Sequence, residues 1–213
     1  MENTRAKTTR NSLILLLTAT IWGMAFVSQS KGMDYMHPFT FNGVRSLIGA
    51  AGILVYILIS RKIAGDKAAK LDWKLNVRAG LLCGIFLTIA STLQQFGIKY
   101  TSVGKAGFIT ALYIVLVPVF STVLGKKAKK SIWLCVIAAV AGLYFLCFDG
   151  SSTLSFSSGD MYVFLSAFAF TAQILAVDYF VQQVDGIALS CAQFAVVIML
   201  SAIGALAFGE HTT

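Results

Sequence analysis

Seven apolar runs, each long enough to cross a lipid bilayer as a helix, constrain this sequence more than any other feature. A transmembrane helix needs about 18 to 20 apolar residues to cross a hydrocarbon core about 30 Å thick. The chain is 57% hydrophobic with a mean hydropathy of +0.79, too apolar for a soluble domain. We therefore predict an all-α integral membrane protein. The runs cover residues 12–30, 39–60, 77–99, 102–125, 131–149, 160–181 and 186–208.

The basic residues fall mainly on one side of these spans. If the N-terminus is cytoplasmic, thirteen of the seventeen Lys and Arg residues lie in the N-terminal segment and the two inner loops that follow spans two and four. Because cytoplasmic loops are enriched in Lys and Arg, we expect a cytoplasmic N-terminus, in a bacterial inner membrane. The net charge of +8 is then a topology signal and predicts no nucleic-acid binding.

Shifting the sequence by 148 positions aligns the first two spans with the last two. The shift places Trp22 on Phe170 and Arg45 on Gln193. The copies start five spans apart, and an odd number of spans turns the second copy upside down in the membrane. We expect a helical bundle of inverted five-span repeats, the second incomplete by three spans. The expected parts are a basic N-terminus at 1–11, a first repeat at 12–149, an outer linker at 150–159 and the truncated second repeat at 160–213.

Polar and aromatic residues share one face of the first span, where Trp22, Phe26 and Gln29 follow helical spacing. An amide in hydrocarbon is costly without a partner, so this face should turn toward the bundle interior. Gly23 lies beside it, where a neighbouring helix would approach closely. Such faces predict a cavity for a small amphipathic solute; alternatively, they only hydrogen-bond neighbouring helices. The later spans contribute Gln95, Thr110, Tyr113, Phe170 and Gln173.

Charged residues and one proline add further candidates. Arg45 lies about 10 Å along the second span, where a charge is a functional candidate, although it could also be a structural, snorkelling Arg. With Lys99 and Lys105 it would form a cationic mouth that favours a carboxylate or phosphate. The alternatives are headgroup contact for Lys99 and snorkelling for Lys105. Asp178 is the only acidic residue expected inside a span, close to the interface. Pro118 in the fourth span predicts either a hinge or a fixed packing angle.

The sequence offers no candidate for a metal, a cofactor or catalysis. The cysteines fall inside apolar runs without C-x-x-C pairing, and neither a His/Glu metal pair nor a G-x-S-x-G motif is present. We therefore expect neither a cofactor nor enzymatic activity. The four cysteines are Cys83, Cys135, Cys147 and Cys191.

Four stretches resemble the EamA-like members of the drug/metabolite transporter superfamily: "LTATIWGMAFVSQ", "PFTFNGVRSLIGAAGIL", "YTSVGKAGFITALYIVLVPVFSTVLGKK" and "GDMYVFLSAFAFTAQIL". The resemblance covers nearly all of residues 12–208 and implies a ten-span, 5+5 inverted-repeat fold with a central substrate cavity. It implies a secondary transporter, an exporter or exchanger of a small metabolite such as an amino acid or a related amphipathic or anionic solute, working by alternating access. The alternative is a non-transporting assembly subunit or inactive fragment. The expected partners are the solute, the bilayer, and either a second copy of the chain or the missing spans.

Overall fold

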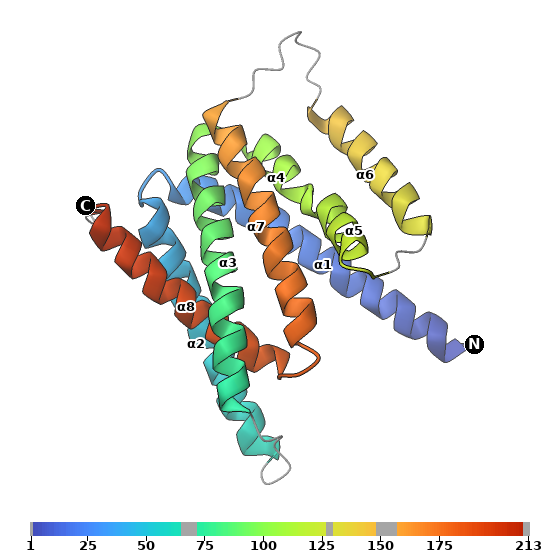
Figure 1. Ribbon diagram of the computed structural model, residues 1–213, viewed down its shortest axis with the longest axis horizontal. Helices are drawn as coiled ribbons and strands as arrows, with labels where there is room; N and C mark the ends of the chain where they lie inside the picture. The colour runs from blue at the N-terminus through green and yellow to red at the C-terminus, as the bar shows by residue number, and fades with distance from the viewer. Residues whose placement is uncertain (1, 65–71, 127–129, 148–156, 211–213) are drawn as a thin grey trace.

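The computed structural model shows a bundle of helices and describes residues 2–64, 72–126, 130–147 and 157–210 (Figure 1). These described residues contain helices and turns and no strand, which confirms the all-α prediction. The helices are α1 (Glu2–Gly32), α2 (Pro38–Ala64), α3 (Trp73–Tyr100), α4 (Val103–Ala111), α5 (Tyr113–Val123), α6 (Lys130–Cys147), α7 (Ser158–Phe180) and α8 (Gly186–Ala207).

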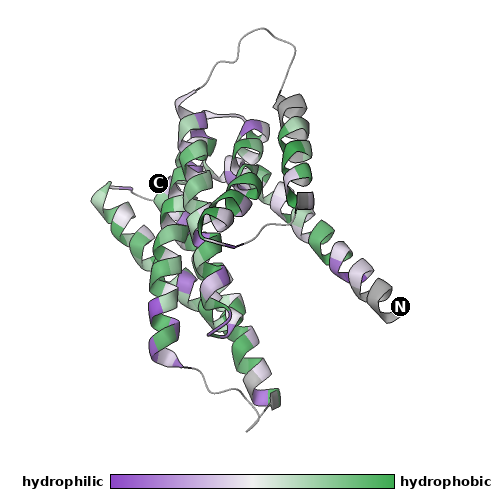
Figure 2. Cartoon of the chain, turned by 45° about the vertical axis from the view of Figure 1, so that its right-hand side comes forward, coloured by the Kyte–Doolittle hydropathy of each residue, from purple (hydrophilic) through white to green (hydrophobic). Residues whose placement is uncertain are grey.

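Six segments of the described chain are long and apolar enough to cross a membrane, so this is an integral membrane protein. They match six of the seven expected runs, and Figure 2 shows hydrophobic residues along most of the helices. The fifth expected run, 131–149, coincides with α6 but extends beyond the described residues, so this span stays a prediction. The six segments are Thr8–Gly32, Pro38–Ser60, Trp73–Tyr100, Val103–Val123, Ser158–Phe180 and Gly186–Ala207.

Short polar side chains fix where four of the helices begin. The first N–H groups of a helix have no partner within the helix, and a side-chain oxygen just before it can accept from them. Each of these residues accepts a hydrogen bond from a backbone N–H in the first turn of its helix. They are Asp72 before α3, Ser102 before α4, Ser157 before α7 and Asp185 before α8.

α3 is the central helix of the bundle. It packs along both α7 and α8, while α2 packs along α8. Glycines make these contacts close: a Cβ built at Gly97 would lie 2.3 Å from Cγ2 of Val163 on α7, and one at Gly80 would lie 2.4 Å from Cβ of Ala192 on α8. Side chains at these two positions would push the helices apart.

The end of α8 caps the start of α2. The carboxylate of Glu210 accepts hydrogen bonds from the N–H groups of Phe39 (3.3 Å) and Thr40 (2.8 Å) and from the Thr40 hydroxyl (2.9 Å). Gly209, with φ at 63°, turns the chain so that Glu210 follows directly after α8. A negative charge at a helix N-terminus is favourable, so this contact holds α2 and α8 together at one end of the bundle.

α1 is the least covered of the spans. It runs obliquely behind the other helices in Figure 1, and large side chains along it stay exposed, among them Leu15 at 70% and Trp22 at 50%. Nothing in the described part of the chain lies within 4 Å of a Cβ built at Gly23. The close helix contact expected at Gly23 is therefore not found among these residues.

α1 and α7 run in opposite directions through the bundle (Figure 1). Gln95, near the end of α3, donates a hydrogen bond to Sδ of Met33 just after α1 (3.4 Å). Gly159, in the first turn of α7, packs against the backbone of Tyr100 at the same end of α3. Opposite directions are required of an inverted repeat. The repeat itself, with its boundaries at 12–149 and 160–213, stays a prediction.

Candidate solute-binding site

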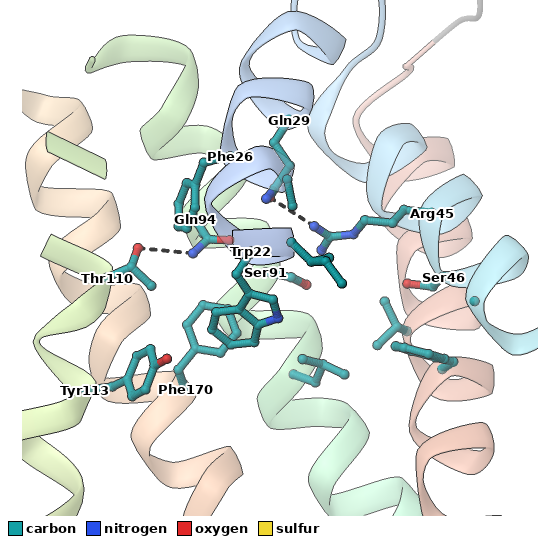
Figure 3. A pocket seen from close by; sticks show the side chains of 16 residues that line it. Trp22, Phe26, Gln29, Arg45, Ser46, Ser91, Gln94, Thr110, Tyr113 and Phe170 are labelled. Atoms are coloured by element: carbon teal, nitrogen blue, oxygen red, sulfur yellow. Dashed lines mark hydrogen bonds between the residues drawn. The ribbon is translucent and has the colours of Figure 1, made fainter. Parts of the chain in front are cut away.

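A cavity of about 430 Å³ lies where α1, α2, α3, α7, α8 and the fourth span (α4 and α5) meet (Figure 3). This volume falls within the range of about 300 to 1,000 Å³ that is typical of small-molecule sites. The structure brings together seven of the ten residues that the sequence suggested for solute binding. The seven are Trp22, Phe26, Gln29, Arg45, Thr110, Tyr113 and Phe170.

Aromatic rings from three helices form one wall of the cavity. Trp22 of α1 and Tyr113 of α5 meet edge to face, with ring centroids 6.2 Å apart and an interplanar angle of 71°. Phe170 of α7 lies behind the Trp22 indole in Figure 3, and Arg45 lies on the other side of the cavity. About half of the Trp22 surface is not covered by protein. Exposed aromatic faces of this kind suit planar apolar groups.

Arg45 extends from α2 toward the cavity and is held by two neutral amides. Its Nη1 donates to Oε1 of Gln29 on α1 (2.9 Å), and its Nη2 donates to Oδ1 of Asn42 on α2 (3.1 Å). Its guanidinium also lies 5.8 Å from the ring centroid of Phe41. None of the ion pairs found in the described part of the chain involves Arg45. Its charge is therefore oriented but not neutralised.

A second hollow, of about 590 Å³, lies between α1 and α2. Gln29 and Arg45 border this hollow as well as the cavity, so their hydrogen bond lies between the two spaces. Most of its other lining residues are apolar, including Met24, Val44 and Ile48. Arg45 therefore borders both the cavity and the second hollow.

Uncharged polar groups complete the cavity. Nε2 of Gln94 on α3 donates to Oγ1 of Thr110 on α4 (3.1 Å), which joins these two helices at the wall (Figure 3). Ser46 and Ser91, both almost fully buried, also line the space. Hydroxyls elsewhere on the predicted polar faces bond within their own helix, as Thr88 does to the carbonyl of Gly84. Both expected roles of these polar residues, lining and packing, therefore occur.

Two glutamines of the predicted site do not line the cavity. Gln95 is fully buried and donates to Met33, while its neighbour Gln94 takes the place at the wall. Gln173 of α7 donates to Oε1 of Gln193 on α8 (2.8 Å). Gln193 corresponds to Arg45 in the 148-residue shift, and each pair joins the first two helices of its predicted repeat. Gln173 thus joins α7 to α8 and lies outside the cavity lining.

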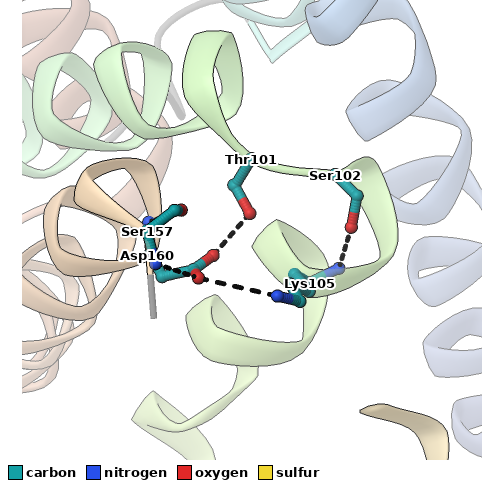
Figure 4. Close-up of polar contacts among 5 residues, drawn as sticks. All are labelled: Thr101, Ser102, Lys105, Ser157 and Asp160. Carbon is teal, nitrogen blue, oxygen red and sulfur yellow. Dashed lines mark hydrogen bonds and ion pairs between the residues drawn. The ribbon is translucent and has the colours of Figure 1, made fainter. Parts of the chain in front are cut away.

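Lys105 also lies away from the cavity, in a polar cluster at one end of the bundle (Figure 4). Its Nζ is 3.8 Å from a carboxylate oxygen of Asp160 on α7. Asp160 accepts further hydrogen bonds from the Thr101 hydroxyl and from the N–H of Ser157 (2.9 Å). The Asp160 side chain is only 3% exposed. A buried carboxylate attracts the ammonium group, so Lys105 does not form the expected cationic mouth with Arg45.

Asp160 also corrects the expectation that Asp178 is the only acidic residue inside a span. Asp160 lies within the candidate span Ser158–Phe180, and its capping role at the start of α7 explains how its charge is tolerated there. Asp178, near the other end of α7, forms an ion pair with Lys126, and both side chains are more than half exposed. The interfacial position expected of Asp178 stays a prediction.

The fourth span is divided at Leu112. The N–H of Leu112 donates to the carbonyl of Ile109 (3.1 Å), three residues back, and the helix resumes as α5. Pro118 lies inside α5, where its ring has no N–H for the carbonyl of Ile114. A proline disturbs the turn that precedes it, and the division lies on that side. The hinge role of Pro118 stays a prediction.

Within the described residues there is no group of three or more His, Cys, Asp or Glu side chains that could hold a metal ion. The cavity lining itself offers a cation, neutral hydrogen-bonding groups and aromatic faces around a hollow. Such a site can hold a small solute reversibly.

Comparison with known proteins shows what this chain is similar to. The chain is 31% identical over 168 residues to an uncharacterized transporter of Archaeoglobus fulgidus, covering 78% of this chain and 48% of that protein. It is 28% identical over 142 residues to the uncharacterized transporter YwfM of Bacillus subtilis, covering 66% and 46%. The chain spans about half the length of these curated relatives. No solved structure matches it significantly.

The sequence profile of the EamA-like transporter family matches residues 10–148, well over half of the chain. The matched region contains most of α1 and all of α2 to α6, with six of the seven predicted residues that line the cavity. This chain belongs to the EamA-like transporter family.

Proposed function

We propose that the chain provides the solute site of a secondary transporter, and that a small amphipathic or anionic metabolite, such as an amino acid, binds in the cavity. The observation that carries this proposal is the cavity itself, which gathers Arg45, neutral amides and aromatic rings at one place among apolar helices. Such groups are costly in a membrane unless they serve one another or a ligand.

Alternating access requires the cavity to open to one side of the membrane at a time. Two ion pairs tie α7 to the fourth span at opposite ends, Lys105 with Asp160 and Lys126 with Asp178. Between them the fourth span is divided at Leu112 and contains Pro118. We propose that the fourth span moves against α7 about this region. We propose that it works as an exporter or exchanger, with the N-terminus in the cytoplasm as the charges predict.

The test is solute counterflow in liposomes that contain the full chain, with a panel of labelled amino acids, nucleosides and organic acids. Trp22→Ala removes a wall of the cavity and should lower flux at least about tenfold, the effect of about 1.4 kcal/mol of lost binding. Trp73→Ala is the matched control, because Trp73 is 67% exposed at the start of α3 and lies outside the cavity. Equal flux of the wild type and Trp22→Ala would contradict the proposal.

A second candidate function has an observation in its favour. α1 is almost wholly exposed. The chain would then act as an assembly subunit or inactive fragment that does not transport alone. A chimera that adds the C-terminal half of the Bacillus subtilis relative YwfM separates the two: flux only in the chimera favours the second function, and flux in both favours the first.

A further inference from the structure

In the described part of the chain, the residues that line the cavity carry one positive charge and no negative charge. Neither Asp nor Glu is among its lining residues. The buried carboxylate of Asp160 is engaged with Thr101, Ser157 and Lys105, outside the cavity. A cation in an apolar setting is costly unless it is paired. The partner of Arg45 is therefore best supplied by the solute.

The hydrogen bonds of Arg45 leave room for such a partner. A guanidinium group has five N–H donors and accepts nothing. Two of the five donate to Gln29 and Asn42, and the other three have no partner in the described part of the chain. Both amides present their carbonyl oxygens to Arg45, so the group is fixed in orientation before a solute arrives. A carboxylate, with two oxygens in a plane, matches this planar fork.

The aromatic wall sets the rest of the solute. Trp22, Tyr113 and Phe170 line the cavity across from Arg45 (Figure 3). Trp22 is half exposed. Edge-to-face or offset stacking on such rings favours a planar aromatic group. A second negative charge on the solute would lie among these rings without a counter-charge. The lining offers no acid to bind an ammonium group, so binding does not need an amino group on the solute.

We propose that the cavity binds a solute with one carboxylate and one aromatic ring, and that it requires no amino group on that solute. The carboxylate pairs with Arg45, and the ring packs on Trp22. This assignment deepens the proposed function and rests on it, because it takes the cavity as the solute site.

The experiment uses the full chain in an uncharged detergent, with Trp73→Phe and Trp133→Phe so that Trp22 is the only tryptophan. Trp22 fluorescence is titrated with 3-phenylpropionate, its neutral amide, 3-phenylpropylamine and butyrate. We expect the phenylpropionate to bind at least about tenfold more tightly than each of the others. Tenfold corresponds to about 1.4 kcal/mol.

Arg45→Gln should bring the carboxylate-to-amide ratio of dissociation constants to about one. Should this variant fail to fold, as judged by its melting curve, Arg45→Lys serves instead: it keeps the charge without the planar fork and should retain a weaker preference. Lys31→Gln is the matched control, because the Lys31 side chain is 79% exposed and lies outside the cavity. It should leave all four titrations unchanged.

Equal binding of the carboxylate and the amide, or tighter binding of the amine, would overturn this ligand class. If the flux panel still shows transport that depends on Trp22, the proposed function survives that result. If no probe changes the Trp22 fluorescence and no member of the panel shows flux, both the ligand class and the proposed function fall.

Discussion

Asp160→Asn tests the polar cluster that joins α3, α4 and α7. The carboxylate accepts hydrogen bonds from the Thr101 hydroxyl and the Ser157 N–H, and Lys105 lies 3.8 Å away. Asn keeps the shape of the side chain, and the Thr101 hydroxyl can turn to accept from its amide. The substitution therefore removes the charge and leaves the number of hydrogen bonds unchanged.

The expected cost follows from these contacts. A hydrogen bond to a charged group contributes about 1.5 to 3 kcal/mol and a neutral one about 0.5 to 1.5, so each of the two bonds loses about 1 kcal/mol. The pair with Lys105 adds less than about 1 kcal/mol, because the Lys105 side chain is 42% exposed and solvent screens the interaction. The free energy of unfolding should therefore fall by about 2 to 3 kcal/mol in total. For a chain of this size that corresponds to a fall in Tm of about 4 to 12 °C.

The assay is thermal unfolding in detergent, followed by tryptophan fluorescence. Lys105→Gln is the control, since it removes the half-exposed ion pair and leaves the Asp160 carboxylate with its two hydrogen bonds, so it should lower Tm by less than about 4 °C. An Asp160→Asn variant that melts with the wild type would refute the reasoning. A Lys105→Gln variant whose Tm falls as far as that of Asp160→Asn would show that Lys105, and not the hydrogen bonds of Asp160, stabilises the cluster.

Two further predictions concern stability. Glu210→Gln weakens the cap on α2, where the carboxylate accepts hydrogen bonds from the N–H and the hydroxyl of Thr40. It should lower the free energy of unfolding by about 1 to 2 kcal/mol, and unchanged thermal unfolding would contradict the capping role. Gly97→Ala places a Cβ 2.3 Å from Val163 and should cost about 1 to 3 kcal/mol, whereas Gly52→Ala meets nothing within 4 Å and should not lower Tm. Similar melting of these two alanine variants would argue against the close packing of α3 on α7.

The positions of the spans could be predicted because the bilayer itself imposes them. Helix length in hydrocarbon is fixed by its thickness, and polar residues gather at the ends. The second span was expected at 39–60, and α2 begins at Pro38, where proline suits the first helical position. The division of the fourth span at Leu112 could not be placed, since Pro118 predicts a distortion without fixing the turn that takes it up.

Which residue of a polar face meets the cavity was harder to predict. Gln94 and Gln95 are three and four residues after Ser91, so both continue its face at helical spacing. The structure places Gln94 at the cavity, while Gln95 bonds Met33 in the turn after α1. That choice depends on how α1 and α3 pack, and local spacing contains no information on this packing.

Lys105 shows the same limit for charged residues. Its partner Asp160 is far along the chain, and only the packing of α4 on α7 brings the two together. The polar surroundings of Arg45 are easier to predict, because a charge deep in an apolar run needs polar neighbours wherever the helices lie. Gln29 and Asn42 supply them.

The most direct test of the account is whether a transported solute occupies the cavity. Ala25→Cys is placed in a chain whose native cysteines are replaced by serine, because Ala25 lines the cavity on α1. A water-soluble thiol reagent labels it with and without a solute that the proteoliposomes transport. At ten times the dissociation constant, about one site in eleven is free, so labelling should slow about tenfold. Lys31→Cys, on the exposed end of α1, should label at the same rate throughout. Labelling of Ala25→Cys that is indifferent to a transported solute would contradict the central claim.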